Sequence, residues 1–370
     1  MSDGSRAACM AKRPERGDAA SMNPRIAIVC AGAIGGYVGA YMTRAHEDVV
    51  LIDQYPEHVE AMRGEGVHLS GLLSRDNFAT RVNALHIHEA QGLSRQRPID
   101  IAFITAKSYD TAWAATMIRP YLSPNGFVVS LQNAINEETI ASVVGWGRTM
   151  GVAIAGLGVE LYAPGKVKRT QKEAEGQVVF RAGEVHGRVT PRAELVAKLL
   201  GAADRASTTT NLWGERWTKL IVNVMRNGVA AVSGLGGPDQ NGNEVARWAM
   251  IRLAAEAVRV GQALGYTLGS AQGLDPETLA RAGEGDKACL DTITRQLLET
   301  AILRADDNRP SMAQDVLKGR RTEIDDMNGL VVARGKDIGI PTPANANIQM
   351  LVHKVMRGEI APGMDALRAV

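Results

Sequence analysis

A glycine-rich turn between an apolar run and a helix-like segment constrains this chain more than any other feature. Residues 25–39 read Arg-Ile-Ala-Ile-Val-Cys-Ala-Gly-Ala-Ile-Gly-Gly-Tyr-Val-Gly, and the run at 26–29 lacks the polar alternation of a half-exposed strand. Gly32 would let the backbone approach a pyrophosphate, and Gly35 would let the helix pack closely on the strand. The first helical amides, at Ala33 and Ile34, would hold the phosphate charge. The segment therefore predicts a dinucleotide-binding strand-turn-helix unit.

One position departs from the G-x-G-x-x-G pattern, because Cys30 stands where the first glycine is usual. For the turn to work, we expect Cys30 to adopt a β-region backbone with its thiol pointing into the sheet. The match is partial, so the segment also fits small residues that merely permit tight packing of a helix on a strand.

Asp53 ends the second apolar run, about twenty residues after the glycines. A carboxylate at that place can accept hydrogen bonds from an adenosine ribose and repel a 2′-phosphate. Asp53 therefore favours NAD over NADP, although either dinucleotide fits the glycine turn. The alternative is a simple helix cap before Pro56.

The order of strand-like and helix-like segments predicts two domains, as expected for 370 residues. Strand-like runs alternate with helical patterns as far as about residue 200, which favours a doubly wound parallel sheet. A hairpin is expected around 163–166, with the basic run 166–172 exposed to solvent. Long helical patterns follow from Leu212, with later helices expected to start at Asp275-Pro276 and Thr342-Pro343. We predict a flexible tail (1–23), a dinucleotide-binding domain (24–205) and an all-α domain for substrate binding or dimerisation (206–370).

Charge and cysteine content narrow the class of partner. The net charge of +2 gives no broad basic field, so neither nucleic acid nor an anionic membrane is expected as a partner. Charged residues interrupt every apolar run that could span a bilayer. The three cysteines are odd in number and widely spaced, which fits a reducing, cytoplasmic setting and no metal site. A small-molecule substrate is expected, and a homodimer is left open.

Three polar side chains share one face of the first long helix. Lys219, Asn223 and Asn227 are four residues apart among apolar neighbours, so a ligand or an interdomain network must satisfy them. A lysine in a half-buried cleft is a plausible acid, because burial lowers its pKa. Two further polar residues, Lys107 and Asn133, follow apolar runs and are placed to face a cofactor at the ends of strands.

Near the C-terminus, two residues allow two interpretations each. Ser311 can bind a carboxylate, or it can form a capping box with Gln314. Glu323 can orient a reacting hydroxyl or hold a ribose, or it can be an exposed helix acid that pairs with Arg320.

Several features of this sequence combine into one pattern: the glycine turn, Lys107, Gln132-Asn133, the stripe from Lys219 to Asn227, and the motifs at 311–315 and 322–325. The pattern resembles the ketopantoate reductase (2-dehydropantoate 2-reductase) family from about residue 25 to the C-terminus. The resemblance implies a Rossmann-type domain followed by an all-α domain, with the active site between them, and a role in pantothenate biosynthesis. The residues that it makes functional fall into three groups: Lys219 as proton donor; Asn223, Asn227 and Ser311 as substrate ligands; and Lys107, Asn133 and Glu323 in the cofactor site and the catalytic site.

Several positions differ from that family. Cys30 and Ala134 replace glycines, Gly228 replaces a proline, and Asp53 stands where NADPH-using members have an arginine. We therefore predict an NAD(P)H-dependent reductase of a 2-oxo acid or related ketone, with NAD favoured. The alternatives are an opine-type or other NAD-dependent hydroxyacid dehydrogenase, and a dinucleotide-binding protein without turnover.

Overall fold

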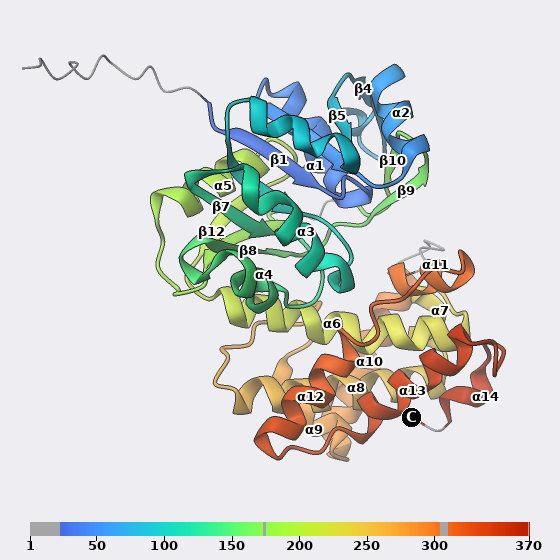
Figure 1. Cartoon of the computed structure of the whole chain (residues 1–370). Helices are drawn as coiled ribbons and strands as arrows, with labels where there is room; N and C mark the ends of the chain where they lie inside the picture. The colour runs from blue at the N-terminus through green and yellow to red at the C-terminus, as the bar shows by residue number, and fades with distance from the viewer. Residues whose placement is uncertain (1–22, 173–174, 304–309, 369) are drawn as a thin grey trace, which may run out of the picture.

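The computed structural model describes residues 23–172, 175–303, 310–368 and 370. An α/β domain lies above an all-helical domain, and α6 (Leu212–Ser233) runs along the boundary between them (Figure 1). This arrangement confirms the predicted fold class. Apart from residue 23, the predicted N-terminal tail lies outside the described residues. No helix in the described ranges is long and apolar enough to cross a membrane.

The α/β domain is built on an eight-stranded sheet with the order β12-β11-β8-β7-β6-β1-β2-β5. All neighbouring strands are parallel except β8 and β11. Strand order reverses between β1 and β6, and in open α/β sheets a ligand is expected to bind at the carboxyl ends beside such a reversal. The strands are β1 (Arg25–Val29), β2 (Asp48–Asp53), β5 (Asn83–His86), β6 (Ile99–Ile104), β7 (Leu122–Ser130), β8 (Thr149–Ile154), β11 (Phe180–Glu184) and β12 (Ala206–Thr209).

The predicted domain boundary at 205/206 falls before the last strand of this sheet, β12, and not after it. β12 begins at Ala206, just beyond the predicted boundary, and pairs in parallel with β11. α6 then starts at Leu212. A division near residue 211 would keep the whole sheet in one domain, and the predicted division at 205/206 stays a prediction.

A second sheet of four strands, in the order β4-β3-β10-β9, covers α1 (Ala33–Arg44). Its strands are β3 (Val67–Ser70), β4 (Phe78–Thr80), β9 (Val159–Ala163) and β10 (Lys166–Arg169). The antiparallel pair of β9 and β10 confirms the predicted hairpin. The sequence did not show that this hairpin would join β3 in a separate sheet, because strand pairing depends on residues about a hundred positions apart.

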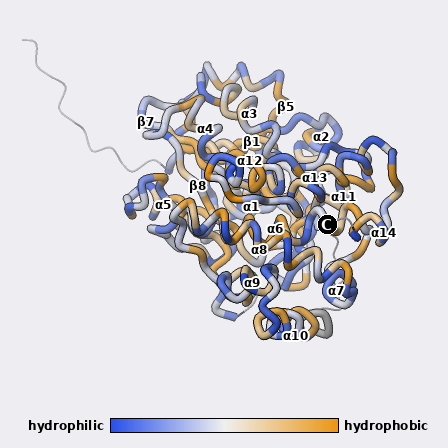
Figure 2. Tube along the Cα trace, turned by 90° about the horizontal axis from the view of Figure 1, so that it is seen from below, coloured by the Kyte–Doolittle hydropathy of each residue, from blue (hydrophilic) through white to orange (hydrophobic). Residues whose placement is uncertain are grey.

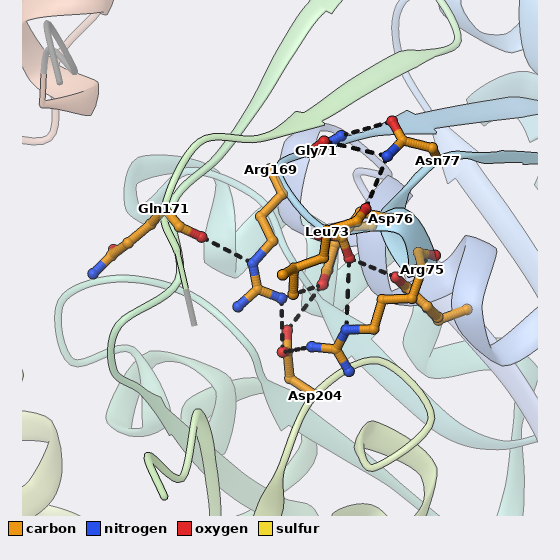
Figure 3. Close-up of polar contacts among 10 residues, drawn as sticks. Gly71, Leu73, Arg75, Asp76, Asn77, Arg169, Gln171 and Asp204 are labelled. Carbon is orange, nitrogen blue, oxygen red and sulfur yellow. Dashed lines mark hydrogen bonds and ion pairs between the residues drawn. The ribbon is translucent and has the colours of Figure 1, made fainter. Parts of the chain in front are cut away.

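One residue of the hairpin contradicts the prediction of a solvated basic run. Arg169 is buried, and its Nη1 donates to Asp204 Oδ1 at 2.7 Å (Figure 3). The same nitrogen donates to the hydroxyl of Tyr37 at 2.8 Å. Asp204 also accepts a hydrogen bond from Arg75 Nη2 at 2.9 Å. A buried arginine needs such partners. They come from distant parts of the chain, so the local charge pattern could not reveal them.

The remaining helices fall into two groups. Those of the α/β domain are α2 (Pro56–Gly64), α3 (Thr111–Ile118), α4 (Glu137–Val144) and α5 (Pro191–Leu200). The helical domain packs around α6 and α8 (Glu244–Ala263), while α10 (Lys287–Leu303) lies at its edge and alternates hydrophobic with hydrophilic residues (Figure 2). Its other helices are α7 (Gly237–Gly242), α9 (Pro276–Gly283), α11 (Ser311–Leu317), α12 (Asn328–Ile338), α13 (Pro343–Met356) and α14 (Met364–Leu367).

The helices begin where the sequence predicted, but only some of the predicted side-chain caps form. Asp275 caps α9 by accepting from the amide of Thr278 at 2.8 Å. The start of α13 at Pro343 is as predicted, although Thr342 makes no side-chain cap bond. The capping box at Ser311 is wrong, because Ser311 is already the first helical residue and Pro310 occupies the cap position.

The backbone of Cys30 also differs from the expected β-region shape, because its φ is +65°. Ala134, the other residue at a usual glycine position, has a φ of +58°. The left-handed region costs a non-glycine residue about 1–2 kcal/mol. Burial raises the pKa of the Cys30 thiol to about 12, so this cysteine is not a reactive thiolate.

Cys30→Gly is therefore expected to stabilise the protein by up to about 1 kcal/mol, since relief of strain outweighs the extra entropy that glycine loses on folding. Chemical denaturation measures the change. The matched control is Cys289→Gly in the α-helix α10, where there is no strain to relieve and glycine should instead destabilise by a few tenths of a kcal/mol. Equal destabilisation by both substitutions would contradict the strain assigned to Cys30.

Candidate active site

The glycine turn presents free backbone amides at the strand-order reversal. α1 begins at Ala33 directly after Gly32, and the first intrahelical bond runs from the amide of Gly36 to the carbonyl of Gly32 at 2.7 Å. The amides of Ala33, Ile34 and Gly35 precede that bond, so they have no acceptor within the helix. Together with the helix dipole they form a suitable cradle for a pyrophosphate.

The two glycines of the turn face different surroundings. A Cβ on Gly32 would meet no protein atom within 4 Å, whereas a Cβ on Gly35 would lie 2.4 Å from Thr105 Oγ1 and 2.9 Å from Ile28 Cγ2. Gly32 therefore leaves open space on the side where a dinucleotide would approach. Gly35 permits contact between α1 and the sheet.

Gly32→Val should weaken NADH binding by at least about tenfold, because its side chain would fill the space needed by the pyrophosphate. The folded state should survive. Gly35→Val should instead lower the free energy of unfolding by about 1–3 kcal/mol or more through overpacking. Fluorescence titration with NADH and thermal denaturation of both variants separate the two effects. Normal NADH binding by a folded Gly32→Val protein would contradict the pyrophosphate site.

Asp53 ends β2 on the other side of the turn and is only 3% exposed. Its Oδ1 accepts a hydrogen bond from the amide of Tyr55 at 3.0 Å. Burial raises the pKa of Asp53, although that bond opposes the effect. α2 starts at Pro56 with Tyr55 as its cap residue and no side-chain cap bond, so Asp53 shapes a short turn and does not cap the helix.

Glu323 connects the helical domain to the end of β6. Its Oε1 accepts from both the amide and the hydroxyl of Ser108 at 2.9 Å, and its Oε2 lies 3.3 Å from Lys107 Nζ. Lys107 also pairs with Asp315 at 2.6 Å. Burial lowers the pKa of Lys107, but the two carboxylates raise it overall. Lys107 is thus a fixed cation, and the alternative of Glu323 as an exposed acid is wrong, because Glu323 is buried.

A chain of hydrogen bonds continues from this point to α6. Asn136 Nδ2 donates to the Ser108 hydroxyl at 3.2 Å and to the carbonyl of Asn133 at 2.8 Å. Asn223 Nδ2 in turn contacts Asn133 Oδ1 at 3.4 Å. The structure therefore brings four of the sequence-predicted site residues into one polar network across the domain boundary: Lys107, Asn133, Asn223 and Glu323.

Lys219 lies one helical turn before Asn223 on α6 and is half-buried. Burial lowers the pKa of its ammonium group, and no carboxylate in the described ranges opposes that effect. A lysine whose pKa is lowered in this way gives up its proton more readily than an exposed lysine does. One turn further along α6, Asn223 reaches Asn133 just beyond the end of β7, which places this part of the helix near that strand end.

The other two predicted substrate ligands stand outside this network. Asn227 is buried and contacts the sulfur of Met327 at 3.4 Å. Ser311 starts α11, which packs on α6, but no hydrogen bond within the described parts of the chain joins Ser311 to Lys219, Asn223 or Asn227. Their roles stay predictions.

Sequence reasoning gave no role to Ser108, Asn136 or Asp315, all of which are buried in the network. Ser108 follows Lys107 directly, and Asp315 closes the motif that begins at Ser311, so their positions beside predicted site residues were the available signal. Ser108 binds Glu323 and Asp315 binds Lys107, so both contacts cross the domain boundary. Spacing within one segment could not predict them.

Comparison with known proteins identifies the family. The model described as ketopantoate reductase PanE/ApbA matches residues 26–183, and its C-terminal counterpart matches residues 211–356. A 2-dehydropantoate 2-reductase from Archaeoglobus fulgidus is 30% identical over 344 residues, which cover 90% of this chain and 98% of the relative.

Two solved structures share the fold. A PanE/ApbA family ketopantoate reductase from Ralstonia eutropha superimposes with a TM-score of 0.72 at 28% identity, covering 90% of this chain and 99% of that one. A D-mandelate dehydrogenase with NADH and anilino(oxo)acetate gives a TM-score of 0.73 with the same coverages, and at 20% identity it shows the fold alone. The chain is a dinucleotide-dependent reductase that resembles 2-dehydropantoate 2-reductase, and it belongs to the ketopantoate reductase family.

Proposed function

We propose that the chain reduces the carbonyl of a small 2-oxo acid to a 2-hydroxy acid, with Lys219 as the proton donor. A bound nicotinamide dinucleotide would supply the hydride to the carbonyl carbon. The ammonium of Lys219 would give its proton to the carbonyl oxygen and stabilise the negative charge that develops there. The observation that carries this proposal is the half-buried Lys219, one turn from an asparagine bonded to the strand ends.

The other side chains would hold and orient the substrate. Asn223, Asn227 and Ser311 have donors suited to a carboxylate or a hydroxyl group. Glu323 would keep the end of β6 in place through Ser108 and orient the reacting group. This arrangement would exclude water from the site when the two domains hold a substrate between them.

The cofactor that these residues favour is NAD. Free amides at 33–35 and the open space beside Gly32 suit the pyrophosphate of either dinucleotide. Asp53 would accept hydrogen bonds from the adenosine ribose and repel a 2′-phosphate. A homodimer and a cytoplasmic location stay predictions from the sequence.

A substrate panel measured with both NADH and NADPH tests the proposed function. The panel contains 2-dehydropantoate, other 2-oxo acids, 2-oxo lactones and simple ketones. We expect NADH oxidation with a 2-oxo acid. Since a neighbour of the same fold is a D-mandelate dehydrogenase, the panel also includes 2-hydroxy acids with NAD, for which faster turnover would favour a dehydrogenase. NADH binding without oxidation of any member would contradict the proposal.

A further inference from the structure

A buried arginine fastens α6 to the strand ends, one turn before Lys219. Arg216 is 2% exposed, and its Nη1 donates to the carbonyl of Gln132 at 2.6 Å and to that of Val152 at 3.2 Å. Its Nη2 donates to the hydroxyl of Ser130 at 2.8 Å. All three acceptors lie on or just beyond β7 and β8, so the guanidinium holds α6 at a fixed distance from these two strands.

The same guanidinium forms a buried ion pair. Arg216 Nε lies 2.7 Å from Oε1 of Glu137, the first residue of α4, which is fully buried. Exchange of a buried ion pair for uncharged groups is often neutral or stabilising, so the presence of this pair is weak evidence for a role in stability. The two terminal nitrogens of the guanidinium, bonded to three acceptors, do supply a rigid fork with defined geometry.

The acceptors of Arg216 are directly connected to the candidate active site. Gln132 precedes Asn133, and its Nε2 donates to the carbonyl of Ala106, the residue before Lys107, at 2.9 Å. Arg216 also starts the helical face that continues through Lys219, since residues three and four apart share a face. Through Gln132, the Arg216 side chain therefore connects α6, which carries Lys219, to the segments that carry Asn133 and Lys107.

We propose that Arg216 is a positioning residue for the reaction, which sets the distance between the ammonium of Lys219 and a carbonyl held at the ends of β6 and β7. This inference rests on the proposed function. A displacement of about 1 Å at a reacting centre can cost about a hundredfold in rate. Loss of the fork should therefore slow hydride and proton transfer more than it weakens cofactor binding.

The test compares three variants in the full-length protein. Arg216→Met leaves Glu137 buried without its partner and should lower the melting temperature and the turnover together. Arg216→Met/Glu137→Gln removes the buried charge as well and should regain most of the melting temperature. Arg216→Lys keeps the positive charge, but its single ammonium nitrogen cannot bond all the acceptors that the planar guanidinium bonds at once.

Three measurements separate positioning from stability: the NADH dissociation constant, the single-turnover rate with the best 2-oxo acid, and the isotope effect with C4-deuterated NADH. In the double variant and in Arg216→Lys we expect NADH affinity within about twofold of wild type and single-turnover rates at least about tenfold lower. The isotope effect should rise as the transfer step slows.

A double variant that regains the wild-type rate together with its melting temperature would overturn the inference. If that variant does not fold, an unchanged rate in Arg216→Lys overturns it instead. The two failures are distinguishable. A wild-type protein without activity on any 2-oxo acid would overturn the proposed function and this inference with it, whereas an active wild type with an unaffected variant would overturn the inference alone.

Discussion

Lys219→Met is expected to lower kcat by about a hundred- to ten-thousandfold while leaving the NADH dissociation constant within about twofold of wild type. The substitution removes the group that donates the proton and stabilises the developing alkoxide, yet it keeps the length of the side chain. Binding of the dinucleotide depends on the glycine turn and Asp53, which this substitution does not touch. Steady-state kinetics and fluorescence titration give both numbers.

The same variant should be more stable than wild type at neutral pH. Burial lowers the pKa of Lys219 below its usual value of about 10.4. Above that pH the group is neutral in both the folded and the unfolded chain, so protonation costs nothing. As the pH falls, the unfolded chain takes up the proton first, and the folded state loses stability until the lowered pKa is passed. Methionine abolishes this loss.

Lys336→Met is the matched control, because Lys336 lies exposed on α12 in the same domain. It removes one positive charge from the surface and should leave kcat and the free energy of unfolding nearly unchanged. Equal turnover in Lys219→Met and Lys336→Met would remove Lys219 from its proposed role.

Asp53→Asn is expected to shift the ratio of kcat/KM for NADH over NADPH by about a hundredfold toward NADPH, because a hydrogen bond to a charged group contributes about 1.5–3 kcal/mol. Asparagine keeps an oxygen that can accept from the amide of Tyr55, so the turn should persist. It removes the charge that would repel a 2′-phosphate. Kinetics with both cofactors and one 2-oxo acid measure the ratio.

The control for this second prediction is Glu57→Gln, which removes a negative charge from an exposed residue of the adjoining helix α2. It should leave the cofactor ratio unchanged, since an exposed charge is screened by solvent and salt. A wild-type preference for NADPH, or an unchanged ratio in Asp53→Asn, would contradict the role of Asp53.

Much of the fold could be predicted from the sequence, because its signals are local. The apolar run 26–29 and the glycines after it predicted β1 and α1, and the apolar stretch from Leu212 predicted α6. Local patterns also placed Asp53 and Lys107 at the ends of strands, where the structure has them. Periodicity and turn chemistry are sufficient for such elements.

The features that escaped prediction depend on contacts between distant segments. The charge pattern around Arg169 predicted a solvated hairpin, but Arg169 pairs with the distant Asp204. The sequence around Glu323 likewise carries no local sign of its bonds to Ser108. The left-handed backbone of Cys30 is also imposed by its surroundings, because a free cysteine avoids that conformation. Only the packed chain shows such effects.

The pH dependence of single-turnover NADH oxidation, with a saturating 2-oxo acid, tests the central claim most directly. If Lys219 donates the proton, the wild-type rate constant falls as the pH rises through the lowered pKa of Lys219, at a value below about 10.4. The slow residual rate of Lys219→Met should show no such fall. The same fall in both proteins would assign the proton to another group and contradict the proposed mechanism.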